Sequence, residues 1–103
     1  MIRLVVFLTA KPGRRDELLA EFRKVVPTVR AEKGCIEYGP FLDTPNAGPI
    51  QNKIDPDTFV VLETWESLEA LAAHGAAPHM IAFGRTAKDL LANRVLHVLS
   101  SAG

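Results

Sequence analysis

The sequence has no concentration of charge of one sign. Its 12 lysines and arginines balance 12 aspartates and glutamates, and the longest basic run is the pair Arg14-Arg15. A nucleic-acid-binding surface needs clustered basic side chains to neutralise phosphates. We therefore do not expect nucleic acid as a partner.

Cysteine is nearly absent, because Cys35 is the single one in the chain. An internal disulfide is excluded, and there is no C-x-x-C pattern for redox chemistry or zinc. This usage is typical of a reducing compartment, so we expect a cytoplasmic location.

Long hydrophobic runs are also missing. The run IRLVVFLTA, residues 2–10, is far shorter than the roughly 20 residues of a membrane helix, and KPGRR follows it where a signal peptide would have small residues. This run predicts a strand, and we expect no membrane association. With 103 residues, 48% of them hydrophobic and 23% charged, the chain is expected to form one globular domain over residues 1–103.

Hydrophobic periodicity predicts the order β-α-β, long loop, β-α-α-β. Pro27 is expected to kink or restart the first helix, and Gly39-Pro40 to mark a bulge or an edge position in the second strand. The loop from Thr44 to Asp57 contains three prolines and is long for so small a domain, which favours a functional role. The predicted strands are 2–10, 35–43, 58–66 and 94–100, and the predicted helices are 14–34, 67–75 and one that opens at Pro78.

This order is typical of an α+β, ferredoxin-like split β-α-β fold, with a four-stranded antiparallel sheet and the helices on one face. In the first strand Leu4 and Val6 are apolar on one side, and Val5 and Phe7 on the other. The chain's own helices cover only one face of such a sheet. The second apolar face therefore predicts a symmetric homodimer packed sheet to sheet.

Two histidines, His74 and His79, lie five residues apart. On one helix this spacing turns the side chains about 140° from each other, whereas metal ligands belong three or four residues apart. Gly75 and Pro78 also place them on different helices, so we expect no metal site. The alternative to a functional role is that both are structural residues at helix ends, where an imidazole interacts well with the helix dipole.

Glu63 and Trp65 share one side of the third predicted strand with Phe59 and Val61. If this side faces the helices, a mostly apolar pocket with a carboxylate, an indole N–H and imidazoles lies there. Such a pocket suits the binding of a planar aromatic and the removal of a phenolic proton. Glu63 could instead form an ion pair at the rim, Trp65 could be ordinary core, and Tyr38 could lie at a strand edge rather than in the pocket.

Three segments together resemble the antibiotic biosynthesis monooxygenase (ABM) family, in particular its quinol monooxygenase-like branch. They are EKGCIEYGPF (32–41), FVVLETWESLEALAAHGAAPHM (59–80) and LLANRVLHVLS (90–100). The resemblance implies a ferredoxin-like fold in a dimeric α/β barrel, with a pocket in each subunit. The family that the chain resembles includes oxygenases that use no metal, flavin or haem. In these the deprotonated substrate itself reduces O₂.

On this resemblance, the expected activity is monooxygenation of a quinol or polycyclic phenol by O₂, without a cofactor. His74 matches the family's helix histidine and is the expected base or proton relay. The residues expected to bind the substrate are Glu63, Trp65, His79, Tyr38 and Phe83.

Other branches of the family give alternatives. Haem-degrading relatives use a strand-one asparagine, a tryptophan where this chain has His74, and a histidine near Gly84-Arg85, so haem degradation is disfavoured. Isomerases of phosphorylated sugars would need clustered Arg or Lys near the pocket, which the sequence does not show. A non-catalytic dimeric protein that binds a hydrophobic metabolite, and a structural dimer whose pocket is filled by Trp65 and Phe83, also remain open.

Overall fold

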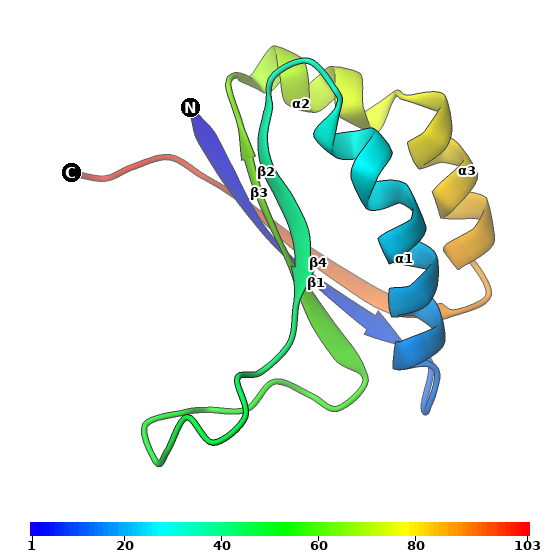
Figure 1. Cartoon of the computed structure of the whole chain (residues 1–103), viewed down its shortest axis with the longest axis vertical. Coiled ribbons are helices and arrows are strands. Elements are labelled where there is room, and N and C mark those ends of the chain that lie inside the picture. The colour runs from blue at the N-terminus through cyan, green and yellow to red at the C-terminus, as the bar shows by residue number, and fades with distance from the viewer.

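The computed structural model describes all residues, 1–103. Its four strands form one antiparallel sheet in the order β2-β3-β1-β4, and the helices cover one face of it (Figure 1). This is the predicted ferredoxin-like α+β fold. The elements are β1 (Ile2–Ala10), α1 (Arg15–Arg30), β2 (Cys35–Phe41), β3 (Thr58–Trp65), α2 (Leu68–Gly75), α3 (Pro78–Ala87) and β4 (Leu91–Leu99).

The core lies between the sheet and the helices. Alternate residues of β1, such as Leu4 and Val6, are buried beneath α1, and they pair with Glu63 and Val61 of β3. The apolar stripe of α1 is buried along its whole length, which includes Phe22. None of the three helices combines the length and apolar composition needed to cross a bilayer.

The first helix differs from the prediction at two points. It runs without interruption from Arg15 to Arg30 and includes Pro27. The restart expected at Pro27 is therefore wrong. Pro27 lies in the last turn and removes one backbone hydrogen bond from the helix. The burial of Val26 and Val29 on either side stabilises the helix by more than this loss costs. The helix also ends before Gly34, which lies in the connection to β2 with a φ of +84°.

The second strand lies at the sheet edge, as Gly39 and Pro40 predict, but the irregularity in its pairing falls between Cys35 and Glu37. Pro40 keeps its place opposite Val61, because an edge strand has one side without ladder hydrogen bonds. The fourth strand begins at Leu91, earlier than predicted, since Leu91 pairs with the end of β1.

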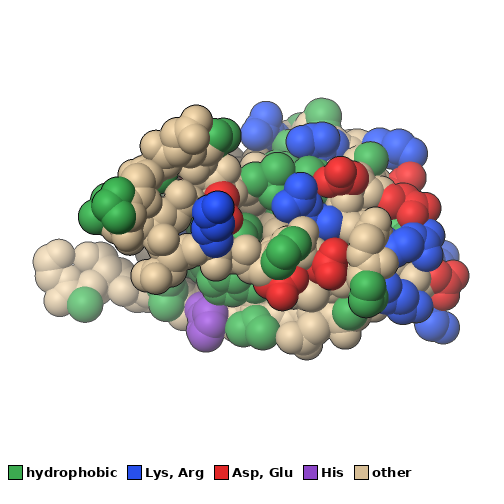
Figure 2. Space-filling model, turned by 90° about the horizontal axis from the view of Figure 1, so that it is seen from below, with side chains coloured by type: hydrophobic (Ala, Val, Ile, Leu, Met, Phe, Trp, Pro, Cys, Tyr) green, Lys and Arg blue, Asp and Glu red, His purple; other side chains and the backbone are tan.

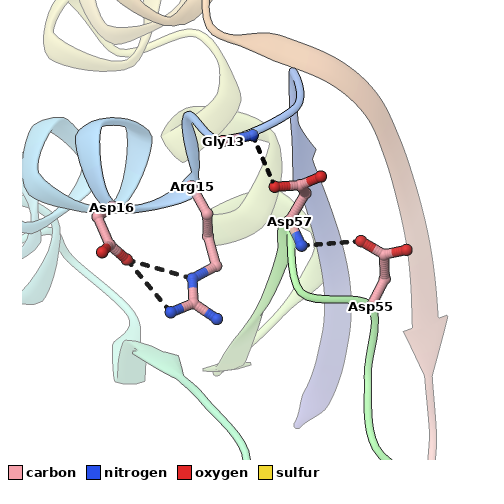
Figure 3. A network of polar contacts seen from close by, with 5 residues as sticks. All are labelled: Gly13, Arg15, Asp16, Asp55 and Asp57. Atoms are coloured by element: carbon pink, nitrogen blue, oxygen red, sulfur yellow. Dashed lines mark hydrogen bonds and ion pairs between the residues drawn. The ribbon is translucent and has the colours of Figure 1, made fainter.

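The long loop after β2 extends away from the body of the molecule (Figure 1). Its end is fixed to the turn after β1. The Gly13 amide donates to a carboxylate oxygen of Asp57 at 3.0 Å, and the Asp57 amide donates to Asp55 at 2.8 Å (Figure 3). The loop therefore leaves the sheet from an anchored base.

The face of the sheet opposite the helices is apolar and uncovered. Phe7 and Val5 lie on it beside Val95 and Leu99 of β4, of which 42% and 48% are exposed. The ring of His97 meets that of Phe7 edge to face at 6.5 Å. From below, hydrophobic side chains are exposed in separate patches, some of them beside a histidine, while charged ones lie mostly in the centre and on the right (Figure 2).

Candidate active site

A cavity of about 610 Å³ lies between the sheet and the helices. This volume is typical of a small-molecule site. Phe83 lines the cavity but does not fill it, and Trp65 lies outside its lining, which contradicts a filled pocket. Most of the lining is hydrophobic and comes from β1, β3, β4 and all three helices, for example Leu4, Val6, Leu18, Phe22, Leu71 and Met80.

One end of the cavity is polar. Tyr38, Glu63 and His74 line it, and they are only 2%, 6% and 6% exposed. No buried side-chain nitrogen or oxygen in the chain lacks a hydrogen-bond partner. The Tyr38 hydroxyl, the second Glu63 oxygen and His74 Nε2 form no such bond within the chain, so these atoms are accessible, and the residues that carry them all line the cavity.

The pairing of β2 with β3 sets Tyr38 opposite Glu63. The Trp65 indole N–H donates to Glu63 Oε1 at 2.8 Å, so the indole orients the carboxylate from behind. The ring of His74 packs on Trp65 with centroids 4.7 Å apart and on Tyr38 at 5.3 Å. The two aromatic rings restrict how the imidazole can turn.

Glu32, which follows the end of α1, joins the two histidines. Its Oε2 lies 2.9 Å from His74 Nδ1 and 2.8 Å from His79 Nε2. A carboxylate only accepts hydrogen bonds, so both imidazoles donate to it. His74 is thereby held with Nδ1–H on Glu32 and with Nε2 free to accept a proton at the cavity.

Residues 1–86 match the family model described as antibiotic biosynthesis monooxygenase. The chain belongs to the ABM family. It is 38% identical over 90 residues to "Probable quinol monooxygenase YgiN" of Escherichia coli (strain K12), a match that covers 85% of this chain and 86% of that protein.

Solved structures share the fold of this chain. PA3566 from Pseudomonas aeruginosa has a TM-score of 0.82 at 29% identity, over 99% of this chain and 94% of that one. A crystal structure of an antibiotic biosynthesis monooxygenase has a TM-score of 0.81 over the full length of both chains, and at 23% identity it supports the fold alone.

Burial governs the ionisation of the acidic groups in this ABM site. It raises the pKa of Glu63 above its usual range, against the opposing effects of the Trp65 hydrogen bond and of His74. Burial also raises the pKa of Tyr38 far above that of a free phenol, so Tyr38 is a hydrogen-bond donor at neutral pH. The Cys35 thiol, whose pKa is likewise raised by burial, packs against the core and does not line the cavity.

The cavity lining also includes two cations that the sequence did not place there. Lys88 follows α3, and Arg94 lies on β4 opposite Leu8, on the helix side of the sheet. Neither forms an ion pair within the chain. The sequence did not indicate basic residues at the pocket, and the structure places these two in its lining, because segments distant from the Glu63 strand in sequence border the same cavity.

Of the residues proposed from sequence, the structure brings Tyr38, Glu63, His74 and Phe83 to the cavity lining. Trp65 and His79 lie outside it. Trp65 is hydrogen-bonded to the cavity residue Glu63, and His79 shares the Glu32 carboxylate with the cavity residue His74. The histidines are on separate helices, α2 and α3, as the Gly/Pro break predicts. Side chains five residues apart diverge by about 140° only on one continuous helix. Here the short turn between the two helices brings both imidazole rings to the Glu32 carboxylate.

A third residue that the sequence did not indicate is Glu32. It falls at the end of the predicted helix 14–34, beyond the last residue of its apolar stripe, and no nearby histidine in the sequence indicates a partner. The available signal was indirect, since the segment EKGC opens the first of the three family-like stretches.

Proposed function

We propose that this ABM-family protein is a monooxygenase that hydroxylates a quinol or a polycyclic phenol and needs no metal, flavin or haem. The observation that carries the proposal is the orientation of His74, with Nδ1–H on Glu32 and the opposite nitrogen at the cavity. The name of the relative YgiN, at 38% identity, supports the same substrate class. The free thiol of Cys35 is compatible with activity in a reducing cytoplasm.

In this proposal His74 is the general base. Its Nε2 accepts a proton from a substrate hydroxyl, and the resulting imidazolium is stabilised by the Glu32 carboxylate. The Tyr38 hydroxyl donates to the phenolate oxygen. The apolar lining, which includes Phe22 and Phe83, binds the aromatic ring and excludes water.

The substrate supplies the electrons. The anion gives one electron to O₂, and the resulting semiquinone and superoxide combine into a peroxide at a ring carbon. The O–O bond then breaks, and one oxygen atom leaves as water. The ring carbon that bound the peroxide loses its hydrogen and keeps the other oxygen atom. For a hydroquinone the sum is quinol plus O₂ to hydroxyquinone plus water, in which the quinol loses four electrons and O₂ gains them.

The test is oxygen uptake with a panel of hydroquinones and polycyclic phenols, followed by mass spectrometry of products formed under ¹⁸O₂. We expect one labelled oxygen in the product. His74→Ala should lower kcat by about 10²- to 10⁴-fold, the usual contribution of a general base. His97→Ala, on the opposite sheet face, is the matched control and should retain activity.

Wild-type turnover by His74→Ala on every active substrate would refute the base assignment. Ligands that raise the unfolding temperature without any product would instead identify a non-catalytic binding protein.

A second candidate is an isomerase of a small phosphorylated sugar, which is favoured by Lys88 and Arg94 in the cavity lining. A phosphate needs such cations. Isomerisation of a sugar phosphate panel followed by NMR tests it, and the double change Lys88→Ala and Arg94→Ala should raise KM. Conversion without oxygen uptake would favour this function over the monooxygenase.

We also propose that the protein acts as a homodimer. The support is the uncovered apolar sheet face around Phe7 and Val95, which the chain's own helices do not reach. A second copy packed sheet to sheet removes this surface from water and closes a dimeric α/β barrel.

A further inference from the structure

Three potential metal-binding atoms meet at one point beside the cavity. They are Glu32 Oε2, His74 Nδ1 and His79 Nε2, and all lie within 4.8 Å of one another. We propose that these three residues bind one divalent transition-metal ion, with Zn²⁺ as the probe, in place of the two hydrogen bonds to Glu32.

The distances are close to those of a metal site. For bonds of about 2.1 Å, neighbouring ligand atoms lie roughly 3.0 Å apart in octahedral and 3.4 Å apart in tetrahedral geometry. The two oxygen–nitrogen distances are already 2.9 and 2.8 Å. Only the two imidazole nitrogens, at most 4.8 Å apart, need to move closer. His79 can make this movement, because 26% of its side chain is exposed.

The donor set is suitable for a borderline-soft ion. Two neutral imidazoles and one carboxylate are a common protein ligand set for Zn²⁺, and they leave a fourth position for water. The ring of Trp65 packs against that of His74 at a tilt of 36° and restricts it, so one ligand is held in place before the ion arrives. His79 also borders a shallow depression of about 240 Å³ between α1 and α3, which gives the ion a route from solvent.

Binding at Nδ1 changes the tautomer of His74. The proton that Nδ1 donated to Glu32 must then be carried by Nε2, which faces the cavity. An imidazole in this form can donate a hydrogen bond to a substrate oxygen but cannot accept its proton. Metal binding is therefore expected to block the base, a consequence that rests on the proposed function, whereas the binding itself does not.

The experiment is calorimetric titration of Zn²⁺ into the chelator-treated full chain, with Co²⁺ absorption spectra as a second measurement. We expect one saturable site per chain and Co²⁺ bands typical of nitrogen and oxygen ligands. Glu32→Ala, His79→Ala and the more conservative His79→Gln should each weaken Zn²⁺ binding at least tenfold. Folding of each variant is checked by its thermal unfolding midpoint.

Two matched controls use the same residue types elsewhere. His97→Ala and Glu37→Gln should bind Zn²⁺ as the wild type does, and so should Cys35→Ser. Absence of saturable binding, or wild-type binding by folded Glu32→Ala and His79→Gln, would overturn the proposal. So would loss of the site in Cys35→Ser or a thiolate-to-cobalt charge-transfer band, because the ion would then be on the thiol.

The activity measurement is separate. Oxygen uptake should fall as Zn²⁺ occupies the calorimetrically defined site, and a chelator should restore it. Full uptake at saturating Zn²⁺ would refute the blocked-base consequence. If no substrate is oxidised at all, the proposed function is refuted. The calorimetric titration still decides independently whether the metal site exists.

Discussion

Replacement of Glu32 by Gln tests whether its charge assists proton transfer. The amide oxygen of Gln can still accept both imidazole N–H groups, which lie 2.9 and 2.8 Å from Oε2 in the wild type. The variant therefore removes the negative charge with little change of shape. In the proposed mechanism, it loses the stabilisation of the His74 imidazolium that forms when the substrate gives up its proton.

The size of this loss follows from the hydrogen-bond type. A bond to a charged partner contributes about 1.5–3 kcal/mol, and a neutral one about 0.5–1.5 kcal/mol. The difference is about 1–1.5 kcal/mol at the transition state. Since 1.36 kcal/mol corresponds to a factor of ten in rate, kcat should fall by about 5- to 15-fold, much less than for His74→Ala.

The assay is the initial rate of oxygen uptake at saturating substrate, with Glu37→Gln on the exposed side of β2 as the matched control. KM should change little, because Glu32 is not part of the cavity lining. A kcat equal to the wild type in Glu32→Gln, together with an inactive His74→Ala, would refute the reasoning that the carboxylate stabilises the imidazolium.

Three further predictions concern stability and assembly. Trp65→Phe removes the N–H that binds Glu63 and should lower the free energy of unfolding at neutral pH by at least about 1.5–3 kcal/mol. That bond favours the ionised form of Glu63, against the burial that raises its pKa. The difference in free energy of unfolding between wild type and variant, measured by urea denaturation, should therefore become smaller as the pH falls and Glu63 is protonated in the folded state. A difference that does not change with pH would contradict this. Gly84→Ala should raise the unfolding free energy by about 0.5–1 kcal/mol, since a Cβ there meets nothing within 4 Å, and a destabilised variant would show that the helix needs this glycine. Phe7→Asp should convert the proposed dimer to monomer in sedimentation experiments, whereas Leu68→Asp on α2, 64% exposed, should not, and a dimer mass retained by Phe7→Asp would contradict the proposed interface.

The fold followed from local signals that agree with one another. Ser67, the first residue of the predicted helix 67–75, caps α2, with its hydroxyl accepting from the Ala70 amide at 3.1 Å, and Pro78 opens α3. Such signals depend on neighbours in sequence, so they can be interpreted without the tertiary structure. The restart expected at Pro27 is absent, because the effect of a proline near a helix end depends on the burial of its neighbours, which is a tertiary property.

The site was less predictable for the same reason. Glu63 and Trp65 were paired correctly on one face, because strand alternation is a local rule. The Glu32 contact joins residues 42 and 47 positions apart and has no periodic signature. Arg94 reaches the cavity because β4 pairs with β1, and Lys88 lies there at the end of α3.

The position of Glu32 depends on a close approach that only glycine permits. A Cβ on Gly34 would lie 2.6 Å from the Cβ of Ala70 on α2, and the φ of +84° at Gly34 disfavours other residues. The chain leaving α1 therefore passes directly against α2, and the Gly34 carbonyl accepts from the Glu66 amide at 2.9 Å. This contact brings the carboxylate of Glu32 to the end of α2, where His74 lies. Gly34 thus allows the backbone path that carries Glu32 to His74, although Gly34 itself does not line the cavity.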